Sequence, residues 1–463
     1  MTAEQQLPEG WEANFLKLLC TIKTGDKDVN QGSENGKYPF FTCAQEISNS
    51  ETFSFEGEAI LIAGNGNFNV KFYHGRFEAY QRTYVLQNFK NVDAKYLFYF
   101  INNKLGDITK GNRGSTIKYI RLGDIANYPI IYPTSKETQQ AIVNKIENLF
   151  DEINEGIGRL KTAAQQIQQY RQSLLKNAFN GELTKEWRSK HADTLPSANE
   201  LLAQIQTTRE QHHTQQLADW QTAVSQWEQN GKEGKKPSKP KAPTQAVKFE
   251  ENVAGLPKGW GWIRLGNLNL DIFDGPFGSN LKTKDYVDFG VRVIRLENIG
   301  YLKFITDKYA FITDEKYSTI QKHSIYSGDL IFSSFITDGI RVAIVPDNIG
   351  KAVNKSDCFC LRVLDNTILN KFLAYFLSTR SAYKQAELQI HGVGRPRINT
   401  TQLKNINIPF CSLAEQTQIV AILESKLTAC DQLAAELAKQ LKQAELLKQA
   451  VLKAAFSGGL LDK

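Results

Sequence analysis

One long segment of helical composition occurs twice, and this repeat constrains the fold more than any other feature. Residues 138–183 read TQQAIVNKIENLFDEINEGIGRLKTAAQQIQQYRQSLLKNAFNGEL, and residues 415–460 read EQTQIVAILESKLTACDQLAAELAKQLKQAELLKQAVLKAAFSGGL. The copies align without a gap at an offset of 277 positions, which places Gln139 on Gln416 and Gly181 on Gly458. Because internal repeats decide the architecture of a chain, the sequence predicts two related halves.

Both copies carry apolar or small residues at a strict spacing of seven. This spacing is typical of a coiled-coil seam, and no proline interrupts either copy. The alternative is two amphipathic helices that are each buried in a separate domain. The residues predicted to form the seam are Ile146, Ile153, Leu160, Ile167 and Leu174 in the first copy, and Leu423, Cys430, Leu437, Ala444 and Val451 in the second.

Length and composition indicate an ordinary soluble protein with more than one domain. The 463 residues are too many for one core, and 41% of them are hydrophobic. The formal charge of +7 is compatible with a polyanionic partner, but equally with general solubility. The six cysteines form no CxxC pair, so neither a zinc site nor a disulfide framework is predicted. No signal region or apolar run of membrane-spanning length occurs, so we expect a cytoplasmic protein without membrane attachment.

The remaining sequence also repeats. The pentapeptides LPEGW and LPKGW open the two globular parts. EGEAILIAG aligns loosely with SGDLIFSS, which places Asp329 on Glu58, and GNRGSTIKYIRLGDIANYPI aligns with HGVGRPRINTTQLKNINIPF so that Ile398 falls on Ile120. Short runs such as YPFFT, AILIAG and RTYVLQ predict strands, and NVDAKYLFYFINNKL predicts a helix that ILNKFLAYFLSTRSAYKQA repeats. A Lys/Pro/Gly-rich stretch, GKEGKKPSKPKAPTQ, has the composition of a linker, and its lysines could contact phosphates or simply be solvated.

The predicted class is therefore α+β, a tandem duplication with an internal pseudo-two-fold repeat. Two α/β globular domains are separated by two long antiparallel coiled-coil helices. The predicted boundaries are 1–133 for the first globular domain, 134–184 for the central helix, 185–250 for a polar helical segment and linker, 251–410 for the second globular domain, and 411–463 for the C-terminal helix.

No catalytic motif is present. The chain has no P-loop, dinucleotide fingerprint, GxSxG elbow or HExxH helix, and neither the NPPY nor the DPPY tetrapeptide of amino-methyltransferases. We therefore predict a binding protein with no catalytic residue and no metal ligand.

Polar residues in the loops are suited to reading DNA. Arg and Lys discriminate guanine and Asn and Gln discriminate adenine in the major groove, while glycine-rich loops and hydroxyls suit phosphates. Taken singly, each of these residues is better explained as part of an ordinary solvated loop. The candidates are Asn65, Asn67, Arg76, Gln81, Arg82, Arg113, Ser115 and Thr116 in the first globular domain, and Ser279, Asn280, Lys282, Lys284, Arg292, Arg295, Asn298, Arg395 and Arg397 in the second.

Taken together, these motifs resemble the DNA specificity (S) subunit of type I restriction-modification systems. The resemblance covers nearly the whole chain and is carried by the LP-x-GW openings, AYQRTYVL, GPFGSNLKTKDY, VIRLENI and the helices that end in AFNGEL and AFSGGL. It implies that each globular domain is a target recognition domain that reads one half of a split duplex DNA sequence, and that the antiparallel helices fix the distance between the halves.

The resemblance also implies partners. Two modification (methyltransferase) subunits would dock on the chain and methylate adenine with S-adenosylmethionine, and restriction subunits would use ATP and Mg. None of these cofactors is expected on this chain. Because the two globular domains differ in sequence, the DNA target should be asymmetric. The alternative is a coiled-coil scaffold with two protein-binding domains and no DNA, which salt-dependent binding to duplex DNA would exclude.

Overall fold

The structure is a computed structural model that describes residues 7–240, 242, 247–249, 255–390 and 395–461. It divides into two compact units. Unit 1 comprises Met1–Ala164 and Ala435–Lys463, and unit 2 comprises Gln165–Ala434. The long helices α4 (Lys136–Phe179) and α11 (Leu413–Ala455) each contribute to both units. Each of the two units therefore consists of one globular domain and parts of both long helices.

The two long helices begin at equivalent positions and end within one residue of equivalent positions. The Oγ atoms of Ser135 and Ser412 accept hydrogen bonds from the backbone N–H groups of Thr138 (3.1 Å) and Glu415 (3.2 Å), as helix caps do. The first helix was predicted to extend to residue 184, but it ends at Phe179. Its end is followed by a turn in which Gly181 has φ +81°, and Gly458 has φ +85° after α11. A left-handed turn of this kind ends a helix and favours glycine.

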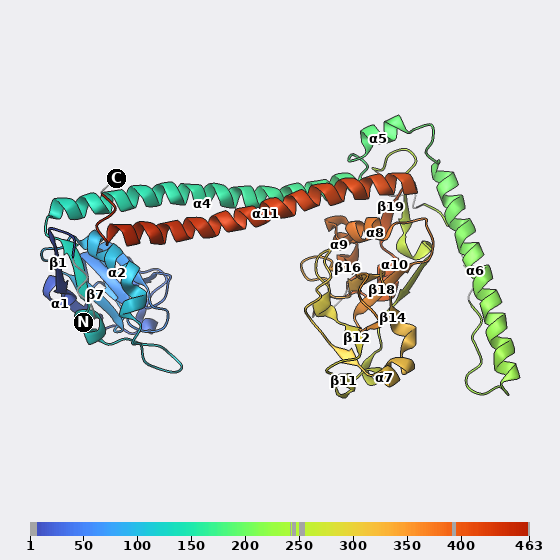
Figure 1. The fold of residues 1–463 in the computed structure, drawn as a ribbon, viewed down its shortest axis with the longest axis horizontal. Coiled ribbons are helices and arrows are strands. Elements are labelled where there is room, and N and C mark those ends of the chain that lie inside the picture. The colour runs from blue at the N-terminus through green and yellow to red at the C-terminus, as the bar shows by residue number, and fades with distance from the viewer. Residues whose placement is uncertain (1–6, 241, 243–246, 250–254, 391–394, 462–463) are drawn as a thin grey trace. The chain divides into compact units, whose positions relative to one another are not determined.

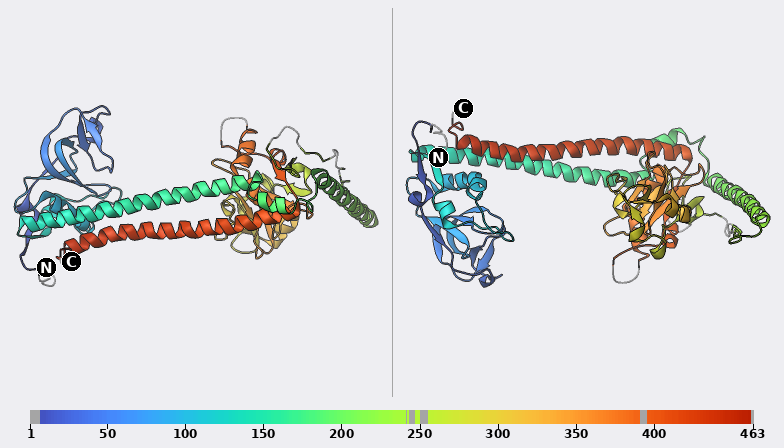
Figure 2. Two further views of the ribbon diagram at one scale, coloured as in Figure 1. Left: turned by 90° about the horizontal axis from the view of Figure 1, so that it is seen from above. Right: turned by 60° about the horizontal axis from the view of Figure 1, so that its bottom comes forward.

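The predicted antiparallel pairing of the two long helices is confirmed, because α4 and α11 lie side by side and run in opposite directions (Figures 1 and 2). In unit 1, Ile146 near the start of α4 shares a hydrophobic cluster with Val451 near the end of α11. In unit 2, Leu174 near the end of α4 shares a cluster with Leu423 near the start of α11. All ten predicted seam residues are buried or half-buried.

A second seam position, four residues after each predicted one, was missed from the sequence. The residues at this position are also buried or half-buried, but several are alanines, and Arg171 and Lys448 occupy two of them. Arg171 forms an ion pair with Asp431 of the facing helix within unit 2. The full set is Phe150, Ile157, Ala164, Arg171 and Ala178 in α4, and Leu427, Ala434, Leu441, Lys448 and Ala455 in α11.

Unit 1 is built on a six-stranded sheet. Its strand order is β2 (Thr21–Thr24), β7 (Thr83–Gln87), β5 (Phe55–Ala63), β6 (Val70–Ala79), β3 (Tyr38–Phe41) and β4 (Ser48–Ser50). The sheet curls until Gly25 lies against Ala79, where an added Cβ would stand 1.9 Å from the Ala79 carbonyl oxygen. Helix α2 (Ala94–Ile108) packs on the sheet, as predicted (Figure 1). A separate antiparallel pair joins β1 (Trp11–Phe15) to β8 (Pro129–Pro133), and the short helices are α1 (Leu16–Leu19), η1 (Val29–Gln31) and α3 (Leu122–Ala126).

Unit 2 repeats this plan with a larger set of strands. The order β10 (Leu270–Phe273), β18 (Cys358–Val363), β15 (Leu330–Ser333) and β16 (Val342–Ile344) forms one sheet. A second sheet has the order β11 (Tyr286–Val287), β13 (Phe311–Ile312), β12 (Val291–Ile294), β17 (Ala352–Asn354) and β14 (Ser324–Ile325). The pair β9 (Gly261–Arg264) and β19 (Asn407–Phe410) is equivalent to β1 and β8. The short helices are η2 (Leu265–Asn267), η3 (Gly278–Asn280), η4 (Thr283–Asp285), η5 (Leu296–Asn298), α7 (Asp314–Thr319), η6 (Gln321–His323) and α10 (Thr400–Lys404).

The late helix of unit 2 was predicted to repeat that of unit 1 but is divided in two. Helix α8 (Asn370–Leu377) is followed by α9 (Arg380–Glu387). Thr379 adopts an extended conformation between them, and its hydroxyl accepts a hydrogen bond from the Ala382 N–H. A threonine cap begins a new helix here and so interrupts the first.

The insert between the two halves contains α5 (Lys185–Lys190) and α6 (Ala198–Gln229), which begins with a capping box of Ser197 and Glu200. Residues 231–240 of the lysine- and proline-rich stretch that was predicted to be a linker run back along α6 (Figure 1). Trp220 Nε1 donates to the Pro237 carbonyl (3.1 Å) and Trp227 Nε1 to the Gly234 carbonyl (3.3 Å). The described part of this stretch is therefore packed against the helix.

Candidate nucleic-acid interface

Three loop segments of unit 1 meet at the end of the central strand β5. The Gly64 N–H donates to the Arg82 carbonyl (2.8 Å), and the Gly64 carbonyl accepts from the Ile120 N–H (2.9 Å). Asn65 forms a further β-bridge with Tyr119. This arrangement joins the β5–β6 turn, the β6–β7 turn and the loop that follows α2.

The same arrangement occurs in unit 2 at the end of β15. The Ser334 N–H donates to the Asp357 carbonyl (2.9 Å), and the Ser334 carbonyl accepts from the Ile398 N–H (2.9 Å). Phe335 forms the β-bridge with Arg397. Ile120 and Ile398 are the residues that the sequence alignment paired. We call each of these sites, residues 64–67, 81–82 and 113–120 in unit 1 and residues 334–335, 355–357 and 395–398 in unit 2, a strand-end junction.

Most candidates of unit 1 lie in its strand-end junction. Asn67, Ser115 and Thr116 are exposed, and Asn65 is half-buried. Arg82 is exposed and forms no ion pair with any residue that the structure describes.

Arg113 and Gln81 also lie at this junction, but each has a carboxylate partner. Arg113 Nη1 lies 2.7 Å from Asp124 Oδ2, and this hydrogen bond lowers the pKa of the Asp124 carboxyl. Gln81 donates to Asp28 at 3.4 Å. These two side chains would have to release, or share, their partners in order to contact a phosphate or a base.

Arg76 lies apart from the other candidates of unit 1. It stands opposite Glu56 in the β5–β6 ladder, whereas the turn between these strands follows the pair of Ile62 and Val70. Its guanidinium is 3.1 Å from Glu56 Oε1 and 4.8 Å from the centroid of the Phe53 ring. The structure therefore does not bring Arg76 to the junction.

Arg395 and Arg397 are the candidates at the junction of unit 2. The Arg395 guanidinium lies over the Phe335 ring at 4.3 Å, and Arg397 Nη1 is 3.7 Å from Asp357 Oδ1. Both are exposed. The guanidinium is planar, and stacking on a ring restrains the orientation of its donors for bidentate recognition of a base or phosphate.

The GPFGSNLKTKDY segment lies beside this junction. Gly275 packs so closely on the β17–β18 turn that an added Cβ would stand 2.1 Å from the Lys355 carbonyl carbon. Asn280, Lys282 and Lys284 are exposed on this segment. The side chain of Ser279, together with residues 391–394 of the HGVGRPR loop, lies outside the described residues.

Three candidates of unit 2, one asparagine and two arginines, are engaged in contacts within the protein itself. Asn298 is fully buried, and its Nδ2 donates to the carbonyls of Ile305 (2.9 Å) and Lys308 (2.8 Å), so it is removed from the surface candidates. Arg292 donates to the Thr306 carbonyl (2.9 Å) and lies over the Tyr309 ring. Arg295 forms an ion pair with Glu297.

Two residues, one in the junction of unit 2 and one beside it, were missed from the sequence. Lys355 lies in the β17–β18 turn with its Nζ 5.5 Å from the Tyr286 ring centroid. Asp274 is half-buried, and burial, with a contribution from Asp357, raises the pKa of its carboxyl to about 6. In the sequence, the Gly275–Pro276 pair indicates a turn that another segment of the chain can approach closely. The approaching residue, Lys355, could not be predicted because it is 80 residues away in the chain.

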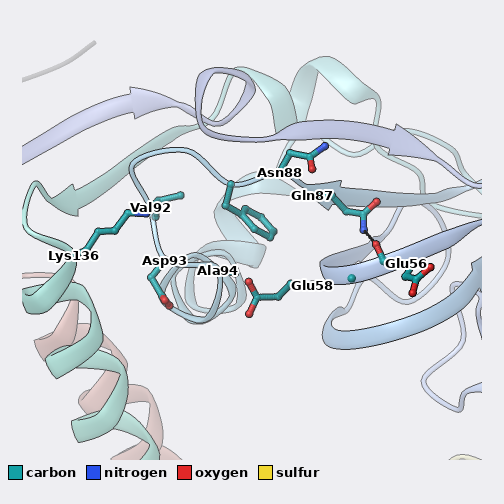
Figure 3. Close-up of a pocket in the computed structure, with 10 residues that line it drawn as sticks. Glu56, Glu58, Gln87, Asn88, Val92, Asp93, Ala94 and Lys136 are labelled. Atoms are coloured by element: carbon teal, nitrogen blue, oxygen red, sulfur yellow. Dashed lines mark hydrogen bonds between the residues drawn. The ribbon is translucent and has the colours of Figure 1, made fainter.

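An acidic pocket of about 370 Å³ opens elsewhere on unit 1. Glu56, Glu58 and Asp93 surround it, with Lys136 at the start of α4 (Figure 3). Glu58 aligns with Asp329 of unit 2. In unit 2 the equivalent place is occupied by Arg362, whose guanidinium donates hydrogen bonds of 3.0 and 2.7 Å to the two carboxylate oxygens of Asp329. Three carboxylates repel phosphate, so this pocket is not part of the DNA-binding candidate surface.

The described residues contain no group of His, Cys, Asp or Glu that could hold a metal ion. Among the helices described, none combines the length and the apolar composition needed to cross a membrane.

The fold is that of specificity subunits of type I restriction-modification systems. One chain of a structure described as "Structural basis underlying complex assembly and conformational transition of the type I R-M system" matches with a TM-score of 0.65 and 17% identity, over 98% of this chain and 100% of that one. The HsdS subunit from Thermoanaerobacter tengcongensis matches with a TM-score of 0.50 and 18% identity, over 99% and 100% of the two chains. At these identities the likeness concerns the fold alone.

The sequence itself then establishes the family. Residues 8–161 and 279–443 match the model of the type I restriction modification DNA specificity domain, and the chain belongs to this family. It is 28% identical over 460 residues to the type I restriction enzyme EcoDI specificity subunit of Escherichia coli, which covers 98% of this chain and 90% of that protein. The EcoAI specificity subunit of Escherichia coli is 25% identical, over 88% of this chain and 70% of that protein.

Proposed function

We propose that this chain is the non-catalytic subunit that selects the DNA sequence for a type I restriction-modification complex. Each strand-end junction reads one half of a bipartite duplex target. The observation that carries this proposal is the repeat of the junction: the same three segments meet through the same hydrogen bonds in both units, yet different side chains occupy them.

The difference between the junctions supports an asymmetric target. The junction of unit 1 presents Asn65, Asn67 and Arg82, whereas that of unit 2 presents Arg395 and Arg397. Asparagine discriminates adenine and arginine discriminates guanine in the major groove. Two unlike readers on one chain therefore select two unlike half-sites.

The long helices are proposed to determine the spacing between the half-sites. Each of them contributes to both units, and 44 residues of α4 extend about 66 Å at 1.5 Å per residue. Linking two weak readers raises the combined affinity only for sites at the matching distance.

The helices would also dock two modification subunits, with which restriction subunits would assemble. S-adenosylmethionine, ATP and Mg would be bound by these partners. The exposed apolar residues Leu446 and Leu447 (both 53% exposed) on α11 support a protein contact on the helices.

The experiment is methylome sequencing of a host that expresses this chain with its modification subunit. A split, asymmetric methylated motif that disappears when this gene is deleted is the expected result. A motif that persists without this chain would exclude it as the specificity determinant.

A further inference from the structure

The insert between the two halves forms a distinct arm on unit 2, defined here as residues 198–240. Helix α6 stands apart from the sheets of unit 2, and the chain that follows it runs back along the helix (Figures 1 and 2). The base of the arm is anchored, because Leu201 and Ile205 are buried in the main hydrophobic cluster of unit 2 with Val247. The Val247 N–H also donates to Gln206 Oε1 at 3.2 Å.

Two tryptophans hold the returning chain in place. Trp220 and Trp227 are seven residues apart, so they lie on the same face of α6. Their indole N–H groups bond to the Pro237 and Gly234 carbonyls. Ordering the backbone of a chain costs about 1–2 kcal/mol of conformational entropy per residue. A segment that served only as a flexible linker would not need to be ordered at this cost.

The returning chain carries a compact basic surface. Lys236 Nζ lies 5.8 Å from the centroid of the Trp227 ring and Lys239 Nζ lies 5.7 Å from that of the Trp220 ring, so both ammonium groups are placed over indole faces. Lys232, Lys235, Lys236 and Lys239 are all exposed, and among the described residues none of them forms an ion pair with a carboxylate. Four ammonium groups are therefore presented from a fixed segment with their charge uncompensated by a close partner.

We propose that this basic edge of the arm binds the phosphate backbone of duplex DNA outside the recognised half-site. The inference rests on the proposed function, since it requires that the chain engages DNA. The lysine ammonium groups act on phosphates as point charges, so we take this contact to be independent of the base sequence. It adds affinity for any duplex and leaves the recognised motif unchanged.

The test is a salt series of binding to two duplexes, one with the methylated motif and one of random sequence. The variant K232Q/K235Q/K236Q/K239Q is compared with the full-length wild-type chain in complex with its modification subunits. Loss of four phosphate contacts is expected to reduce the slope of log K against log salt by up to about 3.6, equally for both duplexes. The ratio of the two affinities stays as in the wild type.

Two control variants separate position from charge. K232R/K235R/K236R/K239R keeps the charge and should bind as the wild type does. K90Q/K303Q/K322Q/K384Q removes four exposed lysines that lie outside the arm and the junctions. It should change the slope by less than one, because general net charge contributes little to close phosphate contacts. Thermal unfolding of all three variants checks that they fold.

The outcomes are distinct. Wild-type affinity and slope in the arm variant would overturn the inference about the arm, and so would an equal loss in the lysine variant outside it. Unchanged DNA binding together with loss of a partner subunit would also overturn it, because the arm would then be a protein contact. Absence of DNA binding by the wild-type complex would instead contradict the proposed function itself.

Discussion

Gln139 and Gln416 make the same hydrogen bonds in the two units. Gln139 Nε2 donates to the carbonyls of Asn91 (2.9 Å) and Pro133 (2.8 Å), and its Oε1 accepts from the Asp93 N–H (2.5 Å). Gln416 Nε2 donates to the carbonyls of Thr367 (3.0 Å) and Cys411 (2.9 Å), and its Oε1 accepts from the Leu369 N–H (2.9 Å). Each fully buried amide ties the first turn of a long helix to the loop before the late helix and to the preceding strand.

Replacing either glutamine should destabilise its own unit. In Gln139→Ala, one backbone N–H and two carbonyls lose their partners in a buried site, and the expected cost is about 2–3 kcal/mol of unfolding free energy. Gln416→Ala should cost a similar amount. Chemical denaturation of each variant measures this, with Gln140→Ala on the exposed face of α4 as the matched control. A change below 0.5 kcal/mol, on the order of surface substitutions, would contradict the structural role.

Substitutions at the two junctions should affect separate half-sites. Arg82→Ala is expected to relax or weaken recognition of one half of the methylated motif, and Arg397→Ala the other. A bidentate contact with guanine is worth about 1–3 kcal/mol of discrimination. Methylome sequencing with each variant reads this out. If each variant relaxed both halves, the assignment of one half-site to each unit would be wrong.

The matched control for the junction of unit 2 is Arg292→Lys. Arg292 is a sequence candidate, but the structure engages it with the Thr306 carbonyl and the Tyr309 ring. Its replacement should lower stability without changing the methylated motif. A changed methylated motif would show instead that Arg292 contacts DNA.

The stability of unit 2 should depend on pH through Asp274. Burial raises the pKa of this carboxyl from its usual value to about 6. The folded state then holds a proton more tightly than the unfolded state, so the stabilisation from protonation is present below about pH 4 and is lost as the pH rises through about 6. Asp274→Asn should therefore be more stable relative to the wild type at pH 8 than at pH 5, by about 1 kcal/mol after allowance for its partial exposure. Equal differences at both pH values would show that the carboxyl is not perturbed.

Lengthening both long helices should lengthen the recognised spacer. One heptad inserted near Gln166 in α4 and one near Glu436 in α11 keeps the seam in phase and adds about 10.5 Å. At 3.4 Å per base pair, this corresponds to about three more base pairs between unchanged half-sites. The methylated motif of the variant gives the spacer directly. An unchanged spacer would place the determinant of spacing outside the helices.

The periodic features of this protein could be predicted from its amino-acid sequence alone. The duplication, the heptad positions from Ile146 to Val451, three strands of the first globular domain and the equivalence of Ile120 and Ile398 all follow from local spacing or from alignment of the chain with itself. These features are visible because a heptad or an alternating strand pattern is set by residues close together in the chain.

Long-range contacts determine which polar residues lie on the surface and which are engaged within the fold. In the sequence, Asn298 and Arg397 are equally plausible DNA-contacting residues. In the structure, Asn298 is fully buried, and its side chain donates to backbone carbonyls that lie seven and ten residues further along the chain. Arg82 reaches the junction and Arg76 does not, because the curl of the sheet and the β5–β6 register separate them. The composition of the returning chain on α6 indicated a linker, but two indole N–H groups, seven and seventeen residues away, hold it against the helix. Whether a polar group is exposed, and which partner it bonds to, depends on the distant backbone groups that the fold brings close to it. The amino-acid composition does not encode those contacts.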